Sequence, residues 1–443
     1  MKKTASILPF VLVMFHCCAA ATCAQTPSVL EGRWEGVMVR EGAELPVILE
    51  FTQSGGSMQG FWSAPAMRVA GVPLTNIRVD LPRVHFELAG DATTTVFDGE
   101  LRADALAGTF KEGSAAATFS LQRAKLLPPA YHEEEVRFQN GAVALSGTLL
   151  SPNRSGPHPA VVFLHGSGPE GRFASRFLAA RFAQQGIAAL IYDKRGVGTS
   201  SGDWKRSTFE DLADDALAGI RLLRQRKEIA PQKIGIYGHS QGGFISPLVV
   251  SRAKPGEVAF VIAAASFGGP AYYQDLYRVG NRLRERFPAD QAGPAMTYYT
   301  QFIEVARTGQ GWGQFDAATE KVRGEPWFSF LALPPKDHWL WAYYRGTGNY
   351  DSLPYWQKVA VPVLLVYGER DRLIPVQESA AAIERQLRKA NNRDYTMVIL
   401  PRADHPLRIQ PDPSQPFEWP LGAPGFPELL AAWVKYRFGA AEK

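Results

Sequence analysis

The segment Gly238–Gly242, which reads Gly-His-Ser-Gln-Gly, follows the apolar, strand-like run Lys233–Tyr237 and precedes a predicted helix at Phe244. A serine on such a sharp strand-to-helix turn has its hydroxyl pushed outward, and glycines are needed beside it because other side chains would collide with the turn. The segment therefore predicts that Ser240 is a nucleophile. The backbone N–H of Gln241, at the start of the helix, is predicted to face a developing oxyanion, which the helix dipole favours.

A second oxyanion donor is expected upstream, where the buried strand Ala160–Leu164 ends in the turn His-Gly-Ser-Gly. Glycines in this turn let a backbone N–H approach a carbonyl oxygen closely. We predict that Ser167 is this donor, with Gly168 as the alternative. His165 precedes the nucleophile in the chain, and we expect it to hold the loop through hydrogen bonds.

Two later apolar strands each end in a loop that carries a candidate partner for the serine. Asp371 is the predicted acid, because a carboxylate just past a strand can accept a hydrogen bond from histidine Nδ1. Glu369, two residues away, is the alternative. His405 is the predicted general base, since it comes last in the order serine, aspartate, histidine that accompanies such a turn. Asp404 is interpreted as structural, because adjacent side chains rarely reach the required ring nitrogen.

The chain is long enough for two structural units, and its patterning changes near residue 128. Residues 25–128 contain short strands punctuated by glycine, which predicts an antiparallel β barrel or sandwich. In residues 129–443 strands alternate with helical patterns, which is typical of a mostly parallel sheet with helices on both faces. The predicted site residues all follow strand ends, and in such a sheet these ends share one edge.

Between about residues 268 and 359 this alternation stops, and the segment is helical in texture and rich in aromatic residues. We interpret it as a cap inserted over the site. Its aromatic side chains either form the cap's own small core or line an apolar pocket, and we expect some to do the latter.

Residues 1–24 have the three-part pattern of a cleavable signal peptide: Lys2 and Lys3, an apolar run from Ile7 to Phe15, and a stretch of small residues. The apolar run is too short to span a bilayer. We therefore predict a secreted or periplasmic protein with no transmembrane segment in the mature chain. The three cysteines, Cys17, Cys18 and Cys23, all lie in this leader, so no disulfide is expected after cleavage.

Charge and composition argue against several classes of partner. The formal net charge is +5, of which the two leader lysines supply two, and the basic residues are dispersed. A basic run interleaved with aromatic residues, which would indicate nucleic-acid binding, does not occur in the sequence. The histidines are far apart and no metal-ligand spacing occurs, so we expect neither a metal nor another cofactor. The charged turn Asp193–Arg195 is interpreted as bracing neighbouring loops rather than contacting substrate.

Together the motifs at residues 165–169, 192–198 and 238–243 resemble the alpha/beta-hydrolase superfamily. The resemblance covers about residues 132–443. It is closer to secreted or periplasmic bacterial serine esterases related to dienelactone hydrolases and serine aminopeptidases. It implies acyl transfer to water without a cofactor. The chain departs from dienelactone hydrolases in having serine in place of cysteine as nucleophile, which puts lactone-ring specificity in doubt.

The resemblance and the motifs predict a carboxylesterase that acts on a small-molecule ester through an acyl-enzyme on Ser240. Two alternatives stay open. One is a non-catalytic binding protein that acts through the N-terminal β domain. The other is a serine peptidase or amidase with the same three residues, whose exopeptidase form would need an acidic group in the cap for the substrate amine. The candidates for that group are Glu304, Asp316, Glu320, Asp337 and Asp351.

Overall fold

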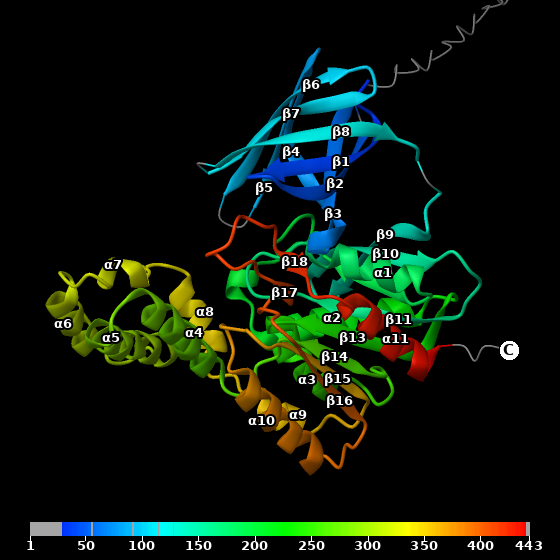
Figure 1. The fold of residues 1–443 in the computed structure, drawn as a ribbon. Coiled ribbons are helices and arrows are strands. Elements are labelled where there is room, and N and C mark those ends of the chain that lie inside the picture. Colours follow the sequence, from blue (N-terminus) through cyan, green and yellow to red (C-terminus); the bar gives the residue numbers. More distant parts are fainter. Residues whose placement is uncertain (1–28, 55, 91–92, 114, 127, 440–443) are drawn as a thin grey trace, which may run out of the picture.

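The computed structural model describes residues 29–439 apart from 55, 91–92, 114 and 127, so the predicted leader lies outside the described residues. A closed antiparallel barrel is followed by an eight-stranded mixed sheet with helices, and a helical lobe projects from the sheet domain (Figure 1). The predicted fold class, an alpha/beta-hydrolase fold preceded by a small antiparallel β domain, is confirmed. In the described part of the chain, no helix combines the length and the apolar character needed to cross a membrane.

The N-terminal domain is a barrel and not a sandwich, because its first and last strands pair with each other, with Trp34 opposite Arg123. All its neighbouring strands are antiparallel. Its strands are β1 (Gly32–Arg40), β2 (Ala43–Ser54), β3 (Ser57–Ala64), β4 (Val69–Asp80), β5 (Arg83–Ala89), β6 (Thr94–Arg102), β7 (Ala105–Glu112) and β8 (Ala115–Ala124). A short 3₁₀ helix, η1 (Pro65–Met67), connects β3 to β4.

Aromatic side chains fill the inside of this barrel. Residues alternate in and out along each strand, and the inward set is large and almost fully buried. The Phe86 ring stacks on Phe97 at 4.7 Å, and Phe97 stacks on Phe110 at 5.5 Å. The barrel is therefore stabilised by a packed core in the way a small globular domain is.

The main sheet has the order β16-β15-β14-β13-β11-β12-β10-β9, and its strands from β11 to β16 run parallel. The first two strands form an antiparallel hairpin at one edge. The bounds are β9 (Tyr131–Asn140), β10 (Val143–Pro152), β11 (His158–Leu164), β12 (Ala188–Tyr192), β13 (Ile229–His239), β14 (Val261–Ala264), β15 (Val363–Gly368) and β16 (Tyr395–Leu400).

Helices cover both faces of this sheet, as its continuous apolar strands require. Alternate residues of β11 show the division, since Val162 packs with one layer of helices and Val161 with the other. The first layer consists of α2 (Phe209–Arg224), α3 (Gln241–Arg252), α9 (Leu353–Trp356) and α10 (Val376–Lys389). The second layer consists of α1 (Arg176–Gln184) and α11 (Phe426–Phe438). A two-stranded ribbon, β17 (Arg408–Ile409) and β18 (Leu421–Gly422), precedes α11.

The projecting lobe is an insertion between β14 and β15 with its own hydrophobic core. It contains α4 (Ala271–Arg286), α5 (Ala289–Thr308), α6 (Trp312–Val322), α7 (Phe328–Leu331) and α8 (Leu340–Thr347). Its two ends lie side by side, because the Ala271 N–H donates to the Tyr350 carbonyl at 2.8 Å and Pro270 bridges to Asp351. This lobe, the predicted cap, therefore joins the sheet domain through a narrow neck.

Replacing Phe86 with alanine removes a fully buried ring that contacts Phe51, Phe97 and Phe119. We expect Phe86→Ala to lower the free energy of unfolding by about 3–5 kcal/mol, the usual effect of removing a buried aromatic ring. Chemical denaturation of the full chain measures this change. The matched control is Val79→Ala, an exposed barrel position; similar losses in both variants would contradict a packed barrel core.

Candidate active site

Ser240 lies on a sharp turn between β13 and α3, with φ of 54° and ψ of −117°. Such a positive φ is rare for a residue with a side chain and persists only where the surrounding structure imposes it. A Cβ atom at Gly238 would lie 2.2 Å from the carbonyl carbon of Gly242, so the turn closes only with glycine at that position. The helix begins at Gln241, three residues earlier than the predicted helix at Phe244. The first-turn N–H of Gln241 thus lies next to the serine.

The structure brings together the three residues predicted from separate strand ends. His405 Nε2 lies 2.8 Å from Ser240 Oγ, and His405 Nδ1 lies 2.6 Å from Asp371 Oδ2. The other Asp371 oxygen accepts hydrogen bonds from the backbone N–H groups of Leu373 and Ile374 at 2.8 and 3.1 Å. The carboxylate is buried and fixed from both sides, so it holds the imidazole with its Nδ1–H facing the acid and its Nε2 facing the serine.

The alternative acids lie elsewhere. Glu369 accepts a hydrogen bond from the backbone N–H of Arg402 at 2.7 Å. Asp404 accepts one from the N–H of Arg408 at 2.8 Å, which agrees with its interpretation as structural. Each of these carboxylates fixes the loop that carries His405.

Two further histidines are structural supports of the site. His165 Nε2 bonds the Tyr192 carbonyl at 2.5 Å, as expected for a residue that holds the glycine-rich loop. Burial, with a contribution from Lys194, lowers the pKa of His165 to about 3. His239 donates from Nε2 to the His405 carbonyl at 2.9 Å, and burial lowers its pKa to about 4. Both imidazoles are therefore neutral near pH 7.

Lys194 connects the two segments predicted to supply oxyanion donors. Its buried ammonium donates to the carbonyls of Gly166 and Gly168 at 2.5 and 2.9 Å and to the Gln241 side-chain oxygen at 3.2 Å. Because C=O and N–H point in opposite directions across a trans peptide, holding the Gly166 carbonyl directs the Ser167 N–H away from the lysine. The sequence placed Lys194 in a charged turn after a strand, but nothing in the pattern indicated that it reaches this loop.

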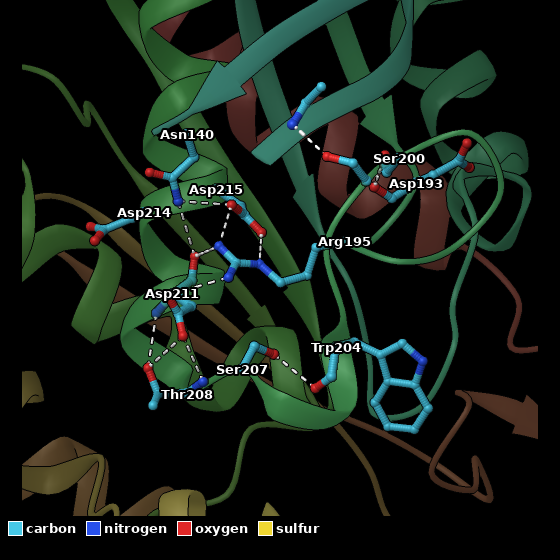
Figure 2. Close-up of polar contacts among 12 residues, drawn as sticks. Asn140, Asp193, Arg195, Ser200, Trp204, Ser207, Thr208, Asp211, Asp214 and Asp215 are labelled. Atoms are coloured by element: carbon cyan, nitrogen blue, oxygen red, sulfur yellow. Dashed lines mark hydrogen bonds and ion pairs between the residues drawn. The ribbon is translucent and has the colours of Figure 1, made fainter. Parts of the chain in front are cut away.

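The neighbouring charges of the turn brace the sheet domain, which confirms their interpretation as structural. Arg195 forms two hydrogen bonds of 2.7 Å with Asp215 on α2, and Asn140 donates to the same carboxylate at 2.8 Å (Figure 2). Asp193 pairs with Arg172 at 2.9 Å. These buried, fully paired groups fix the loop on which Lys194 stands.

The cap divides its aromatic residues between two roles. Trp327 and Trp341 are buried in the cap core. Tyr343 on α8 instead accepts a hydrogen bond from the Gln241 side-chain N–H group at 2.9 Å. Trp339 packs against Trp204, with 5.1 Å between the ring centroids. Trp204 lies in the segment before α2, and its indole points away from the Arg195 network (Figure 2). The cap therefore contacts the nucleophile turn through Tyr343, and its Trp339 packs beside this contact on Trp204.

No cluster of three or more potential metal ligands occurs among the described residues. The arrangement instead joins a serine, an imidazole and a buried carboxylate, which together can move a proton from the serine hydroxyl. A family model described as alpha/beta hydrolase family matches residues 161–418, which contain all five predicted site residues.

The chain belongs to the alpha/beta hydrolase family. This hydrolase is 23% identical over 326 residues to esterase EstD of Thermotoga maritima, a match that covers 69% of each chain. It is 31% identical over 266 residues to thiohydrolase aneE of Aspergillus aculeatus, covering 56% of this chain and 79% of that protein. Among solved structures, an esterase of Pyrococcus furiosus is 19% identical with a TM-score of 0.45, covering 72% of this chain and 96% of the other.

Burial lowers the pKa of Lys194 to about 8, so its charge is present below that pH and lost above it. Because the charge lies beside both segments predicted to supply oxyanion donors, we expect kcat/KM for ester hydrolysis to fall as pH rises through about 8. In Lys194→Met this alkaline limb should be absent, and the plateau should be lower by about tenfold, less than the loss on removing a direct oxyanion donor.

The measurement is a pH profile of kcat/KM, corrected for spontaneous hydrolysis. Lys111→Met, at an exposed barrel position, is the control and should keep the wild-type profile. An alkaline limb retained unchanged in Lys194→Met would contradict the assignment.

Proposed function

We propose that this hydrolase is a serine carboxylesterase that cleaves esters through an acyl-enzyme on Ser240. The observation that carries the proposal is the pair of hydrogen bonds that joins His405 to Ser240 Oγ at 2.8 Å and to Asp371 Oδ2 at 2.6 Å. Acyl transfer requires a base within hydrogen-bond reach of the nucleophile and a group that orients the base. These three residues meet that requirement in one hydrogen-bonded line.

In the first step His405 Nε2 takes the Ser240 proton while Oγ attacks the ester carbonyl carbon. Asp371 stabilises the resulting imidazolium through Nδ1–H. The imidazolium then protonates the leaving alcohol, and the acyl group stays on Oγ. In the second half-reaction His405 activates a water molecule, which attacks the acyl carbon and restores free Ser240 with release of the acid.

The tetrahedral oxyanion of each half-reaction is assigned to the backbone N–H groups of Gln241 and Ser167. Gln241 opens α3, whose N-terminal N–H groups and dipole favour negative charge. Ser167 lies in the loop whose flanking carbonyls are held by Lys194. Donors that are fixed in advance need no rearrangement as charge develops, which is why such groups contribute strongly to the rate.

The state of the cap carboxylates favours an ester over a peptide with a free amine. Glu304, Asp316 and Glu320 are paired with Arg307, Lys336 and Arg323. Asp351 accepts a hydrogen bond from the Leu353 N–H at the start of α9, and Asp337 lies in an exposed turn before α8. Asp275, which the sequence reasoning did not single out, is paired with Arg278 inside the cap. Five of these six carboxylates are therefore already engaged by the chain's own donors.

The relation to EstD, an esterase, supports the same choice. We further propose, from the pattern of residues 1–24 alone, that the enzyme is exported and works in the periplasm or outside the cell.

The nucleophile assignment is tested with Ser240→Ala, which should abolish turnover of chromogenic esters while the unfolding curve stays near wild type. Asp371→Asn should lower kcat by about 10³–10⁴-fold, since an amide favours the wrong imidazole tautomer. Glu369→Gln is the matched control on the same loop, and it should keep kcat close to wild type because the amide oxygen can still accept the hydrogen bond from the Arg402 N–H. Ester turnover retained in pure Ser240→Ala would refute the proposal.

The substrate class is tested by comparing graded acyl esters with aminoacyl anilides, using the wild type and Ser240→Ala. We expect Ser240-dependent turnover of esters and little of anilides. Turnover of anilides alone would move the assignment to a serine peptidase.

A further inference from the structure

The barrel contacts the sheet domain at α1 and the short helix before it, and also at the segment that follows His405. Between β17 and β18 this segment lies against the barrel, where the Trp419 indole N–H donates to the Ala43 carbonyl at 3.1 Å and Arg40 stacks over Phe417 at 4.2 Å. Figure 1 shows β17 and β18 beneath the end of the barrel that carries β3. One part of the hydrolase that contacts the barrel is thus continuous with the loop that holds the predicted base.

Arg68 is a barrel side chain that crosses this interface to the segment after His405. Arg68 follows η1 with φ of 59°, a left-handed conformation, and its Nη2 donates to the Pro406 carbonyl at 2.8 Å and also to the Leu407 carbonyl. The preceding carbonyl, that of His405, is held from the other side by His239. The three successive carbonyls of residues 405–407 are therefore held by hydrogen bonds, the first by His239 of the nucleophile turn and the other two by Arg68 of the barrel.

The position of Arg68 is built into the surrounding structure. Its guanidinium lies over the Phe426 ring at 4.8 Å, and its side chain occupies the space beside Gly422, where a Cβ would lie 2.4 Å from Nε. Glycine at residue 422 therefore leaves room for the arginine. Leu407, whose carbonyl Arg68 binds, itself has φ of 58°, a conformation that a branched residue adopts only when its neighbours impose it.

This arrangement is unfavourable for the arginine considered alone. Its Nε is buried without a hydrogen-bond partner among the described residues. Its guanidinium hydrogen bonds go to backbone carbonyls, and the nearby charge of Asp404 favours its cationic form. Burial lowers the pKa of Arg68 to about 10, so it stays charged at neutral pH. A partly buried charge that is compensated mainly by carbonyls contributes little to stability, which points to a positional role.

We propose that the barrel is a brace for the general base and that Arg68 is the positioning residue through which it acts. By holding the carbonyls of Pro406 and Leu407, Arg68 keeps the His405 imidazole at hydrogen-bond distance from Ser240. This inference rests on the proposed function. It assigns the barrel a role in turnover exerted entirely through its outer surface.

The test uses full-length Arg68→Ala and Arg68→Lys with an ester whose turnover has first been shown to need Ser240 and His405. If wild-type turnover does not need them, the proposed function fails before the brace is tested. Because displacement of a catalytic group by about 1 Å can reduce the rate 10²-fold, we expect Arg68→Ala to lower kcat by about 10- to 100-fold with KM nearly unchanged. Arg68→Lys should recover part of the loss, and added guanidinium ion should raise kcat of Arg68→Ala only.

Arg40→Ala is the matched control, since it removes another barrel arginine from the same interface without touching residues 405–407. It should keep wild-type kcat even if the melting temperature falls. Wild-type kcat in folded Arg68→Ala, or an equal loss of kcat in Arg40→Ala, would overturn the proposal.

Gly422→Ala provides a second route that leaves Arg68 in the chain and stays informative if Arg68→Ala folds poorly. Its Cβ should displace the arginine and reproduce the loss of kcat. In the double variant with Arg68→Lys the two losses should be far from additive, because both act on the same contact. Simple addition of independent losses, or wild-type kcat in folded Gly422→Ala, would contradict the brace.

Discussion

The two hydrogen bonds of the His405 imidazole are the interaction on which the site depends. They join groups from three loops, and each loop follows a different parallel strand of the main sheet. Parallel strands place their carboxyl ends at a common edge, so residues separated by 165 positions meet there without any local contact between their sequences. Small errors in any loop would lengthen one of the bonds, and much of the surrounding structure fixes these loops.

Buried and partly buried cations fix several segments around the site. Arg172 and Arg195 are paired with buried carboxylates, and their geometry is that of structural ion pairs. Lys194 and Arg68 differ, because each binds backbone carbonyls next to a site residue. A cation bound to carbonyls fixes the direction of peptide planes, and peptide planes determine where N–H groups and side chains of the site point. The loops beside the site are thus fixed by Lys194 from within the sheet domain and by Arg68 from the barrel.

The fold and the meeting of Ser240, Asp371 and His405 could be predicted because their information is local. A turn with glycines, an apolar strand and the chain order of the three residues each leave a pattern within a few positions. Asp371 was the predicted acid and Glu369 the alternative on the same loop after β15, and the geometry brings Asp371 to the imidazole.

Arg68, Lys194 and Tyr343 could not be singled out in this way. Arg68 lies 338 residues from its acceptor Pro406, in a turn whose sequence resembles any barrel connection. Tyr343 was one of many cap aromatics, and only the packing of α8 shows that it contacts Gln241 while Trp341 lies in the cap core. Such contacts arise from how separately folded units dock, and a single sequence carries no periodic signal for docking.

At the neck of the cap, a hydrogen bond between Ala271 and Tyr350 holds the two ends of the inserted lobe side by side. The chain therefore enters and leaves the lobe at one place. The sheet receives the chain back at almost the point where it left. Lobes of different length or shape can therefore be exchanged at this junction without changing the register of β14 and β15, which pair directly. Diversification of substrate range in such a scaffold then becomes a matter of replacing one continuous segment, while the reactive groups and the barrel stay as they are.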